Sequence, residues 1–134
     1  MVDKIHFDLV SPERLLISEN AERVTVPGAD GYFGAMAGHM PLISSLRAGF
    51  IEVLGGDQGG KDGKYFIRGG FAEVNADQLT VLAEEAIPMS DFDLATLDQR
   101  IHDTQEDLIA AKTDDERRKV AETLDDLKML RAVF

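Results

Sequence analysis

Hydrophobic and polar residues alternate over the first 87 residues of the chain. In 4–10, Ile5, Phe7 and Leu9 alternate with His6 and Asp8, which is typical of a half-buried strand. Similar short runs predict further strands at 14–18, 21–26, 45–54, 64–68, 71–74 and 79–83. Turns are expected at Ser11-Pro12-Glu13, at Glu19-Asn20, at Gly69-Gly70 and at 75–78. Many short strands joined by turns predict an antiparallel sandwich or barrel.

The pattern changes at Pro88, after which the apolar residues follow helical spacing. The apolar positions of a first helix are Leu94, Leu97, Ile101, Leu108 and Ala111, with Thr104 as a polar break. We expect Ser90 to be its N-cap, because a serine oxygen can accept from the first free N–H groups. Asp91 and Asp93 would then lie at the positive end of the helix dipole, and Lys112 in the last turn.

A second helix is expected to begin at the sequence Thr-Asp-Asp-Glu, 113–116, which has the form of a capping box. Its apolar stripe is Val120, Leu124, Leu127 and Leu130, and it ends near Phe134. Two amphipathic helices with a short connection predict a helical hairpin. The predicted fold class is therefore α+β, with an antiparallel β-sandwich in 1–87 followed by an antiparallel two-helix hairpin in 88–134.

Glycines and prolines interrupt the segment 24–50, where short apolar pieces such as Tyr32-Phe33 and Leu42-Ile43 lie between them. Glycine reaches backbone angles closed to other residues, and proline fixes φ and lacks a donor. The segment is therefore predicted to be a set of tight bends joining short strands. With an aromatic pair and His39 among its bends, it has the character of a contact surface that the sandwich presents to a partner.

Composition narrows the classes of partner. The chain has 134 residues, 44% of them hydrophobic, and a net charge of −11. A core can therefore be buried, while a surface this acidic repels nucleic acids and anionic lipids. There is no cysteine and no apolar run long enough to span a bilayer. The N-terminus has no apolar signal core and is not rich in arginine, so neither a signal nor a transit peptide is expected.

Candidate catalytic and metal-ligating residues are sparse. His39 would need a nucleophile to act as a base, and although Ser44 and Ser45 follow it, no G-x-S-x-G elbow occurs. His6 and His102 stand far from it in the sequence, which predicts no metal site. Glu84 and Glu85 would face opposite sides of a strand. The glycine-rich run 55–63 lacks the Lys-Ser/Thr of a phosphate loop and is expected to be a solvent-exposed hairpin loop.

One basic cluster stands out in this acidic chain, Arg117-Arg118-Lys119 in the second helix. It is either a solvated face balanced by nearby acidic residues or an electrostatic contact for an acidic partner. The choice stays open on composition alone.

Five motifs together resemble the epsilon subunit of the F-type rotary ATP synthase. They are VSPER at 10–14, VPGADGYFG at 26–34, GHMPL at 38–42, GGFAEV at 69–74 and TVLAE at 80–84. Their order and spacing, the boundary near Pro88, the two helices after it and the total length match the family over the whole chain. The resemblance is therefore carried by the set of motifs and not by any single one.

This resemblance implies a non-catalytic subunit of the central stalk, without a cofactor or a metal. It would couple rotation of the c-ring to ATP synthesis and would lie peripherally at the cytoplasmic face of the bacterial inner membrane. Its partners would be the gamma subunit, the c-ring loops and the alpha/beta catalytic head. The residues expected to contact gamma and the c-ring are Gly31, Tyr32, Phe33, Gly34, His39, Met40 and Pro41.

The resemblance also implies that the helices act as a regulatory domain that inhibits ATP hydrolysis by contacting the beta subunits. The residues expected to make this contact are Arg117, Arg118, Lys119, Lys128 and Arg131. Family members that bind ATP carry Ile/Leu-Asp-x-x-Arg-Ala at the start of the first helix. Here Asp98 is followed by an arginine one residue early, Arg100, and the alanine is absent. One residue turns a helical side chain by about 100°, which argues against nucleotide binding.

Two other functions are compatible with the residues alone. One is a small β-sandwich hydrolase that uses His39 as its base. The other is a free-standing adaptor whose helical hairpin captures a partner helix.

Overall fold

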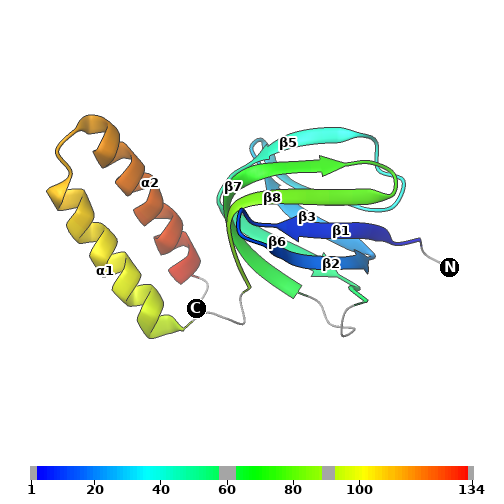
Figure 1. Ribbon diagram of the computed structural model, residues 1–134, viewed down its shortest axis with the longest axis horizontal. Coiled ribbons are helices and arrows are strands. Elements are labelled where there is room, and N and C mark those ends of the chain that lie inside the picture. Colours follow the sequence, from blue (N-terminus) through cyan, green and yellow to red (C-terminus); the bar gives the residue numbers. More distant parts are fainter. Residues whose placement is uncertain (1–2, 58–62, 89–92, 133–134) are drawn as a thin grey trace. The chain divides into compact units, whose positions relative to one another are not determined.

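Residues 3–57, 63–88 and 93–132 are described by the computed structural model. Their contacts divide the chain into two units, Met1–Met89 and Ser90–Phe134. The first unit is built of strands and the second of two helices (Figure 1). The predicted α+β fold class, a β-sandwich followed by two helices, is confirmed.

The first unit contains the strands of a sandwich. They are β1 (Ile5–Val10), β2 (Leu15–Ala21), β3 (Arg23–Gly28), β4 (Gly31–Ala35), β5 (Leu42–Leu46), β6 (Gly49–Leu54), β7 (Gly63–Val74) and β8 (Gln78–Pro88). Pairing runs in the order β2-β1-β8-β7-β5-β3-β4, and β6 joins β3 to β7. The two longest strands, β7 and β8, curve through the unit and so take part in both of its layers (Figure 1).

A pair of glycines lets β7 bend. Gly69 and Gly70 have φ of +71° and +123°, and a Cβ atom on Gly70 would lie 2.0 Å from the carbonyl oxygen of Leu82 on β8. Beyond the bend, 70–74 pairs with β5, and before it, 63–67 pairs with β6. The two strands predicted at 64–68 and 71–74 are therefore one strand, because glycine carries the backbone through the bend instead of ending it.

The opposite correction applies to the strand predicted at 45–54. It is two strands, β5 and β6, separated at Arg47-Ala48. Both strands keep the same register against β7, since Leu46 pairs with Gly70 and Gly49 pairs with Ile67. The interruption thus lies opposite the bend in β7, and the two neighbouring chains turn from one layer to the other at the same level.

Two further predictions about the strands are wrong. No turn occurs at Glu19-Asn20, because β2 continues to Ala21 and Asn20 pairs with His6 of β1. The sandwich is also not wholly antiparallel, since β1 runs parallel to β8 from the His6–Gln78 pair to the Val10–Leu82 pair. Residues 58–62 of the predicted 55–63 loop lie outside the described residues.

The core of the first unit follows the alternation seen in the sequence. Along β1, Ile5, Phe7 and Leu9 are fully buried, while His6 and Asp8 are partly exposed. The other large side chains of this buried cluster include Val24, Val26, Ile51, Ile67, Val74, Leu79 and Val81. The inward positions of successive strands therefore form one apolar layer between the sheets.

The first helix, α1, spans Leu94–Ala110 and begins later than predicted. Its N-cap is Asp93, whose Oδ1 accepts from the Ala95 N–H at 3.1 Å. Ser90, the predicted cap, and Asp91 lie outside the described residues. The helix ends before Lys112, so the prediction of a basic residue in its last turn is wrong.

The second helix, α2, spans Asp114–Arg131 and begins at the predicted capping box. The Thr113 hydroxyl accepts from the Glu116 N–H at 3.1 Å, and Oε2 of Glu116 accepts from the Lys112 N–H, one residue earlier than the usual box. The buried side chains of the two helices are Leu97, Thr104, Leu124, Leu127 and Leu130. Thr104, expected as a polar break, is buried, and its hydroxyl is satisfied by donating to the Arg100 carbonyl at 2.7 Å.

The bend in β7 gives a testable consequence. Gly70→Ala combines a left-handed φ with a clash against the backbone of β8, so we expect the free energy of unfolding to fall by about 3 kcal/mol. Gly34→Ala is the matched control, since it lies in regular strand with only the flexible Arg23 side chain nearby and should change stability by less than about 0.5 kcal/mol. Urea unfolding of both variants measures this, and equal stability would contradict the role of the bend.

Candidate protein-contact surface

One segment of the sandwich is free of charged residues. No Asp, Glu, Lys or Arg occurs between Asp30 and Arg47, a stretch that comprises β4, the loop 36–41 and β5. Its exposed apolar side chains are Tyr32, Met36, Met40, Leu42 and Ile43, of which Met40 is 79% and Ile43 72% exposed. Exposed large apolar side chains gathered in one region mark contact sites more often than solvated surface.

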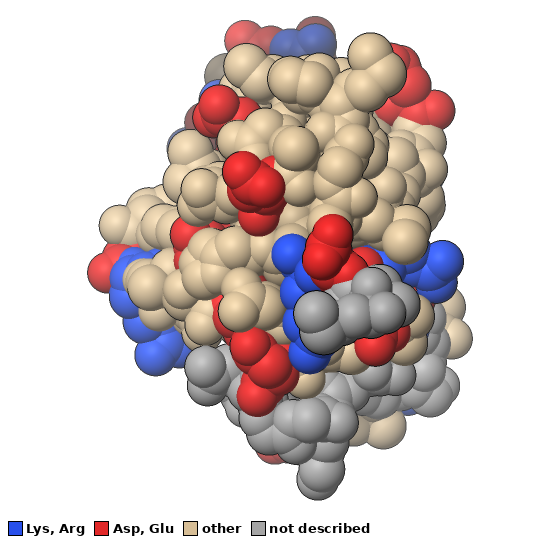
Figure 2. All heavy atoms as spheres, turned by 90° about the vertical axis from the view of Figure 1, so that its right-hand side faces the viewer, with Lys and Arg blue, Asp and Glu red and all other residues tan. Residues whose placement is uncertain are grey.

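The loop 36–41 lies at the right-hand end of the sandwich in Figure 1. Figure 2 faces that end and shows mostly uncharged atoms over its upper half, with charged side chains more frequent below. The Gly38 N–H donates to the Ala76 carbonyl at 2.8 Å, and the His39 N–H donates to Met36 at 3.1 Å. The loop is thus fastened to the turn between β7 and β8, so its exposed methionines project from a held backbone.

His39 is a structural residue in this loop. Its Nδ1 lies 2.6 Å from the carbonyl oxygen of Met40, so Nδ1 carries the proton and donates it. The ring packs 6.3 Å from the ring of Phe33. The nearest candidate nucleophile in sequence, Ser44, donates its hydroxyl to the carbonyl of Ser45. The geometry therefore does not assemble a base and a nucleophile at His39.

Tyr32 and Phe33 point to opposite sides of β4. The Tyr32 hydroxyl accepts from the Phe50 N–H at 3.2 Å, and its ring lies 5.6 Å from the guanidinium carbon of Arg47. Phe33 is half-buried and packs against the core. The residues predicted as one contact set are therefore split, with Tyr32 on one face of β4 and Phe33, beside the His39 ring, on the other.

Further exposed apolar residues were not predicted from the sequence. Phe71 of β7 pairs directly with Leu82 of β8, and the two side chains are 57% and 53% exposed. With Val10 and Pro12 they line a shallow groove of about 420 Å³. The alternation of buried and exposed positions contained this signal. Phe71 directly precedes the buried Ala72 on β7, and Leu82 lies between the buried Val81 and Ala83 on β8, so both side chains face outward.

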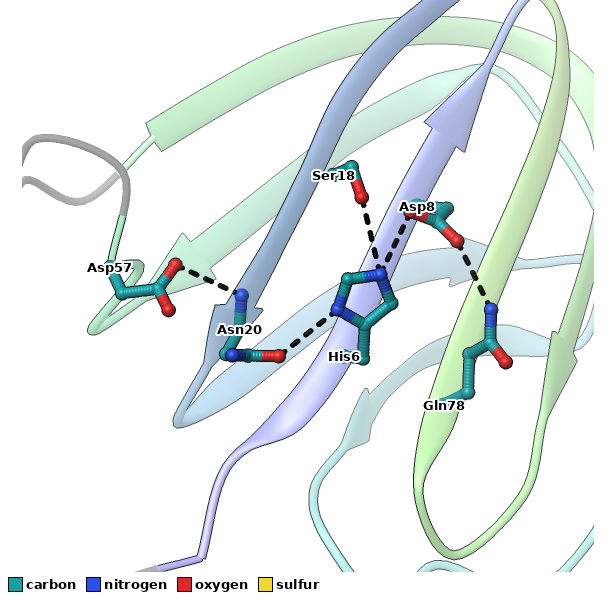
Figure 3. Close-up of polar contacts among 6 residues, drawn as sticks. All are labelled: His6, Asp8, Ser18, Asn20, Asp57 and Gln78. Carbon is teal, nitrogen blue, oxygen red and sulfur yellow. Dashed lines mark hydrogen bonds and ion pairs between the residues drawn. The ribbon is translucent and has the colours of Figure 1, made fainter.

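A polar network crosses the outer face of β2, β1 and β8 (Figure 3). His6 Nδ1 lies 3.0 Å from Oδ1 of Asn20, and its Nε2 lies 3.1 Å from Asp8 Oδ1 and 3.2 Å from Ser18 Oγ. Beyond these three partners, Gln78 donates to Asp8, and the Asn20 N–H donates to Asp57.

This network contains a serine, a histidine and an aspartate, but not as a catalytic triad. In a triad, the serine and the carboxylate bind opposite nitrogens of the imidazole. Here Ser18 and Asp8 both face Nε2, and Asn20 faces Nδ1. The arrangement ties three strands and the 55–57 segment together, and its function is structural.

Glu19 is an unusual inward-facing carboxyl group. It is 9% exposed and packs against Gly56, where a Cβ atom would come within 1.8 Å of Oε1. Burial is the larger cause, and the nearby Asp57 carboxylate the smaller one, of a raised pKa at Glu19. The pKa of Tyr65 is also raised, mainly by burial and to a smaller extent by Glu19.

The described residues contain no group of three or more His, Cys, Asp or Glu side chains that could hold a metal ion.

The predicted basic contact residues on α2 have acidic neighbours. Arg117 pairs with Asp114 at 3.2 Å, and Arg118 pairs with Asp115, each one turn earlier. These pairs are exposed and contribute little to stability, while Lys119 and Lys128 are exposed. The residues lie along α2, so the structure does not gather them into one cluster.

The candidate nucleotide-binding residues, Asp98 and Arg100, have different surroundings in the structure. The Asp98 carboxylate accepts from Nε of Arg131 at 2.7 Å and so connects α1 to the end of α2. Arg100 lines a shallow groove of about 410 Å³ with Ala95, Gln99 and Asp103, among others. Arg131, predicted as a contact to a partner, is therefore engaged within the hairpin.

Within the described ranges, neither helix has the length and apolarity needed to cross a membrane.

Comparison with known proteins identifies relatives over the whole chain. The family model described as ATP synthase, Delta/Epsilon chain, beta-sandwich domain matches residues 4–89. An ATP synthase epsilon chain of Parvibaculum lavamentivorans is 49% identical over 131 residues, 98% of each chain. An ATP synthase epsilon chain of Maricaulis maris is 46% identical over 133 residues, 99% of this chain and 98% of that one.

Solved structures agree with these relatives. A chain in the Euglena gracilis mitochondrial ATP synthase, in an OSCP/F1/c-ring structure, superposes with a TM-score of 0.78 at 26% identity, covering 97% of this chain and 81% of that chain. A chain in the central stalk/c-ring structure of the Tetrahymena thermophila mitochondrial ATP synthase has a TM-score of 0.68 at 14% identity over 97% and 98% of the two chains, which shows the shared fold.

A prediction follows from Glu19. Its folded pKa is raised, so its ionisation disfavours the folded state, and this cost disappears as the pH falls toward the ordinary value of 4.5. Glu19→Gln should therefore raise the melting temperature at pH 7, with a gain that shrinks as the pH approaches that value. Glu13→Gln, at an exposed turn, is the control and should show no such pH-dependent gain. Thermal melts between pH 4 and pH 8 measure the difference; a gain independent of pH would contradict this account of Glu19.

Proposed function

We propose a function from the premise that this chain belongs to the ATP synthase epsilon-chain family. It is a central-stalk subunit of the F-type ATP synthase and does not itself catalyse the reaction. Its task is to help couple proton-driven rotation of the c-ring to ATP synthesis in the catalytic head. The observation that carries the assignment of a contact surface is the uncharged segment between Asp30 and Arg47, which exposes Met36, Met40 and Ile43 in an otherwise acidic chain.

The two exposed apolar regions of the sandwich are proposed to serve two partners. The loop 36–41, with Met40 and Pro41 outermost, contacts the loops of the c-ring. The outer sheet face around Phe71 and Leu82 contacts the gamma subunit. Support for this division comes from the form of the two regions: the loop exposes Met36 and Met40 at one end of the sandwich, whereas the sheet face bears a shallow groove of about 420 Å³. Aromatic and methionine side chains are enriched in such interfaces.

The helical hairpin is proposed to be regulatory. Its basic residues, among them Arg117, Arg118 and Lys119, would contact acidic segments of the beta subunits and inhibit ATP hydrolysis. Support comes from the weakness of their present pairs, which are exposed and exchangeable. The engagement of Asp98 by Arg131 argues against a nucleotide site at this position. In the cell, the subunit would lie at the cytoplasmic face of the bacterial inner membrane, bound to the complex that transports protons.

Met40→Glu tests the contact at the loop. The side chain is 79% exposed, so the isolated chain should fold normally, whereas a charge placed in an apolar interface should weaken the subunit's hold on the enzyme by about tenfold, or about 1.4 kcal/mol. Leu54→Glu, which places the same charge at an exposed apolar site on β6 outside both proposed contacts, is the control. Binding of each variant to enzyme depleted of this subunit, and ATP-driven proton pumping in reconstituted vesicles, are measured. Equal binding of the two variants would exclude the loop as a contact.

Truncation after Pro88 tests the regulatory role of the helices. It spares the strands, so assembly and pumping should stay nearly intact, and ATP hydrolysis should rise. Replacing Arg117, Arg118 and Lys119 by glutamine should produce part of the same rise, and added salt should imitate it by screening. Loss of pumping on truncation, with unchanged pumping in Met40→Glu, would reverse the proposed division of labour.

A further inference from the structure

The two end strands of the pairing order, β2 and β4, differ in the protection of their outer edges. At the β2 edge, the Asp57 N–H donates to the Asn20 carbonyl and the Asp57 carboxylate accepts from the Asn20 N–H, both at 3.0 Å. The Glu22 N–H next to it donates to Leu54. At the other edge, β4 pairs with β3 on one side only, and its sequence, Gly31–Ala35, has no charge or proline. Proteins usually block exposed strand edges with such residues, so the outer edge of β4 lacks the usual protection.

The pairing of β4 with β3 fixes which backbone groups face outward. Antiparallel pairs alternate between hydrogen-bonded and non-hydrogen-bonded positions. Tyr32 lies opposite Pro27, which has no N–H, and the Pro27 carbonyl accepts from the Arg47 N–H at 3.0 Å, on the side of β5. The Pro27–Tyr32 pair is therefore of the non-hydrogen-bonded kind, as is the Thr25–Gly34 pair two residues away. The N–H and C=O groups of Tyr32 and Gly34 point away from β3.

The outward N–H and C=O groups of Tyr32 and Gly34 have the spacing that an added β-strand requires. Among the described residues, no backbone partner lies beyond β4 for the N–H of Tyr32 or of Gly34. An extended segment placed beside β4 would form hydrogen bonds with both residues, because groups two residues apart on one strand match the repeat of another. This is the geometry of strand addition by a peptide.

Two arginines give the edge a charge preference. The guanidinium carbon of Arg47 lies 5.6 Å from the centre of the Tyr32 ring, and the Arg23 side chain covers Gly34, with its Cδ 3.3 Å from where a Cβ would lie. Tyr32 and Gly34 are two residues apart, so both arginines lie over the same face of β4. Neither has an ion-pair partner among the described residues. In a chain of net charge −11, this face of the β3–β4 pair carries two cations, Arg23 over Gly34 and Arg47 over the Tyr32 ring, which reaches across β3 to the Phe50 N–H.

We propose that the free edge of β4 binds an extended, acidic segment of another protein as an added strand. The segment hydrogen-bonds to the backbone of Tyr32 and Gly34, and carboxylates at alternate positions of it pair with Arg47 and Arg23. A second copy of this chain is disfavoured as the occupant, because its open edge carries the same cations and its net charge is equally negative. This assignment does not depend on the proposed function, since it rests on the backbone of β4 and the two arginines alone.

The test uses the full chain, labelled with ¹⁵N, and three capped peptides of about seven residues, the usual length of a strand. The first alternates valine with glutamate, the second alternates valine with lysine, and the third is the glutamate peptide with methylated backbone nitrogens on the residues that would face β4. The glutamate peptide should shift the amide signals of Tyr32 and Gly34 and slow their hydrogen exchange. The lysine peptide should bind at least about tenfold more weakly, and the methylated peptide should not protect these amides.

Matched variants separate strand pairing from general attraction. Gly34→Pro removes the outward donor and should abolish protection at β4, whereas Gly34→Ala keeps the donor and should bind as the parent does. Arg23→Gln with Arg47→Gln should lower affinity for the glutamate peptide about tenfold while thermal melts confirm an intact fold. Equal binding of the methylated or the lysine peptide would overturn the proposal. So would peptide-induced shifts confined to other strands, or protection of Tyr32 and Gly34 that rises with protein concentration in the absence of peptide.

Discussion

Both layers of the sandwich depend on the bend in β7 at Gly69-Gly70. Before it the strand pairs with β6, and after it with β5, so a single chain belongs to two sheets. The close approach of Gly70 to the Leu82 carbonyl leaves no room for a side chain, and β8 follows the same curve. The interruption at Arg47-Ala48 lies at the same level. The exposed loop 36–41 and the groove at Phe71 and Leu82 owe their placement to this shared turn, because it orients the strands that carry them.

Local pattern predicted much of the fold because alternation and three-and-four spacing report which side chains face inward. The burial of Ile5, Phe7 and Leu9 and the capping of α2 by Thr113 follow from it directly. The pattern failed where a residue's type suggested the wrong role. Glu19 and Asn20 have the residue types of a turn, yet both lie in β2. The Glu19 carboxyl is buried and its pKa is raised, and the Asn20 side chain is hydrogen-bonded to His6. Gly69 and Gly70 resemble a break, yet they bend one continuous strand.

The candidate site was predicted in part for the same reason. The segment from Gly31 to Pro41 was recognisable by its glycines and its aromatic pair, but no local signal separates the two faces of β4, on which Tyr32 and Phe33 diverge. The exposed pair formed by Phe71 and Leu82 depends on strand register, which only the long-range pairing of β7 with β8 reveals. The ion pair between Asp98 and Arg131 spans the hairpin in the same way. Sequence indicates which residues are unusual, whereas their neighbours are set by the fold.

The parallel pairing of β1 with β8 has a consequence for synthesis on the ribosome. His6 lies beside Gln78, and Val10 beside Leu82, so the first strand made must wait for nearly the last strand of the unit before it is flanked on both sides. Contacts this distant in sequence slow folding, since a long loop must close before they form. The N-terminal strand thus spends most of translation with one unsatisfied side, and the sandwich closes only as the helices begin to emerge.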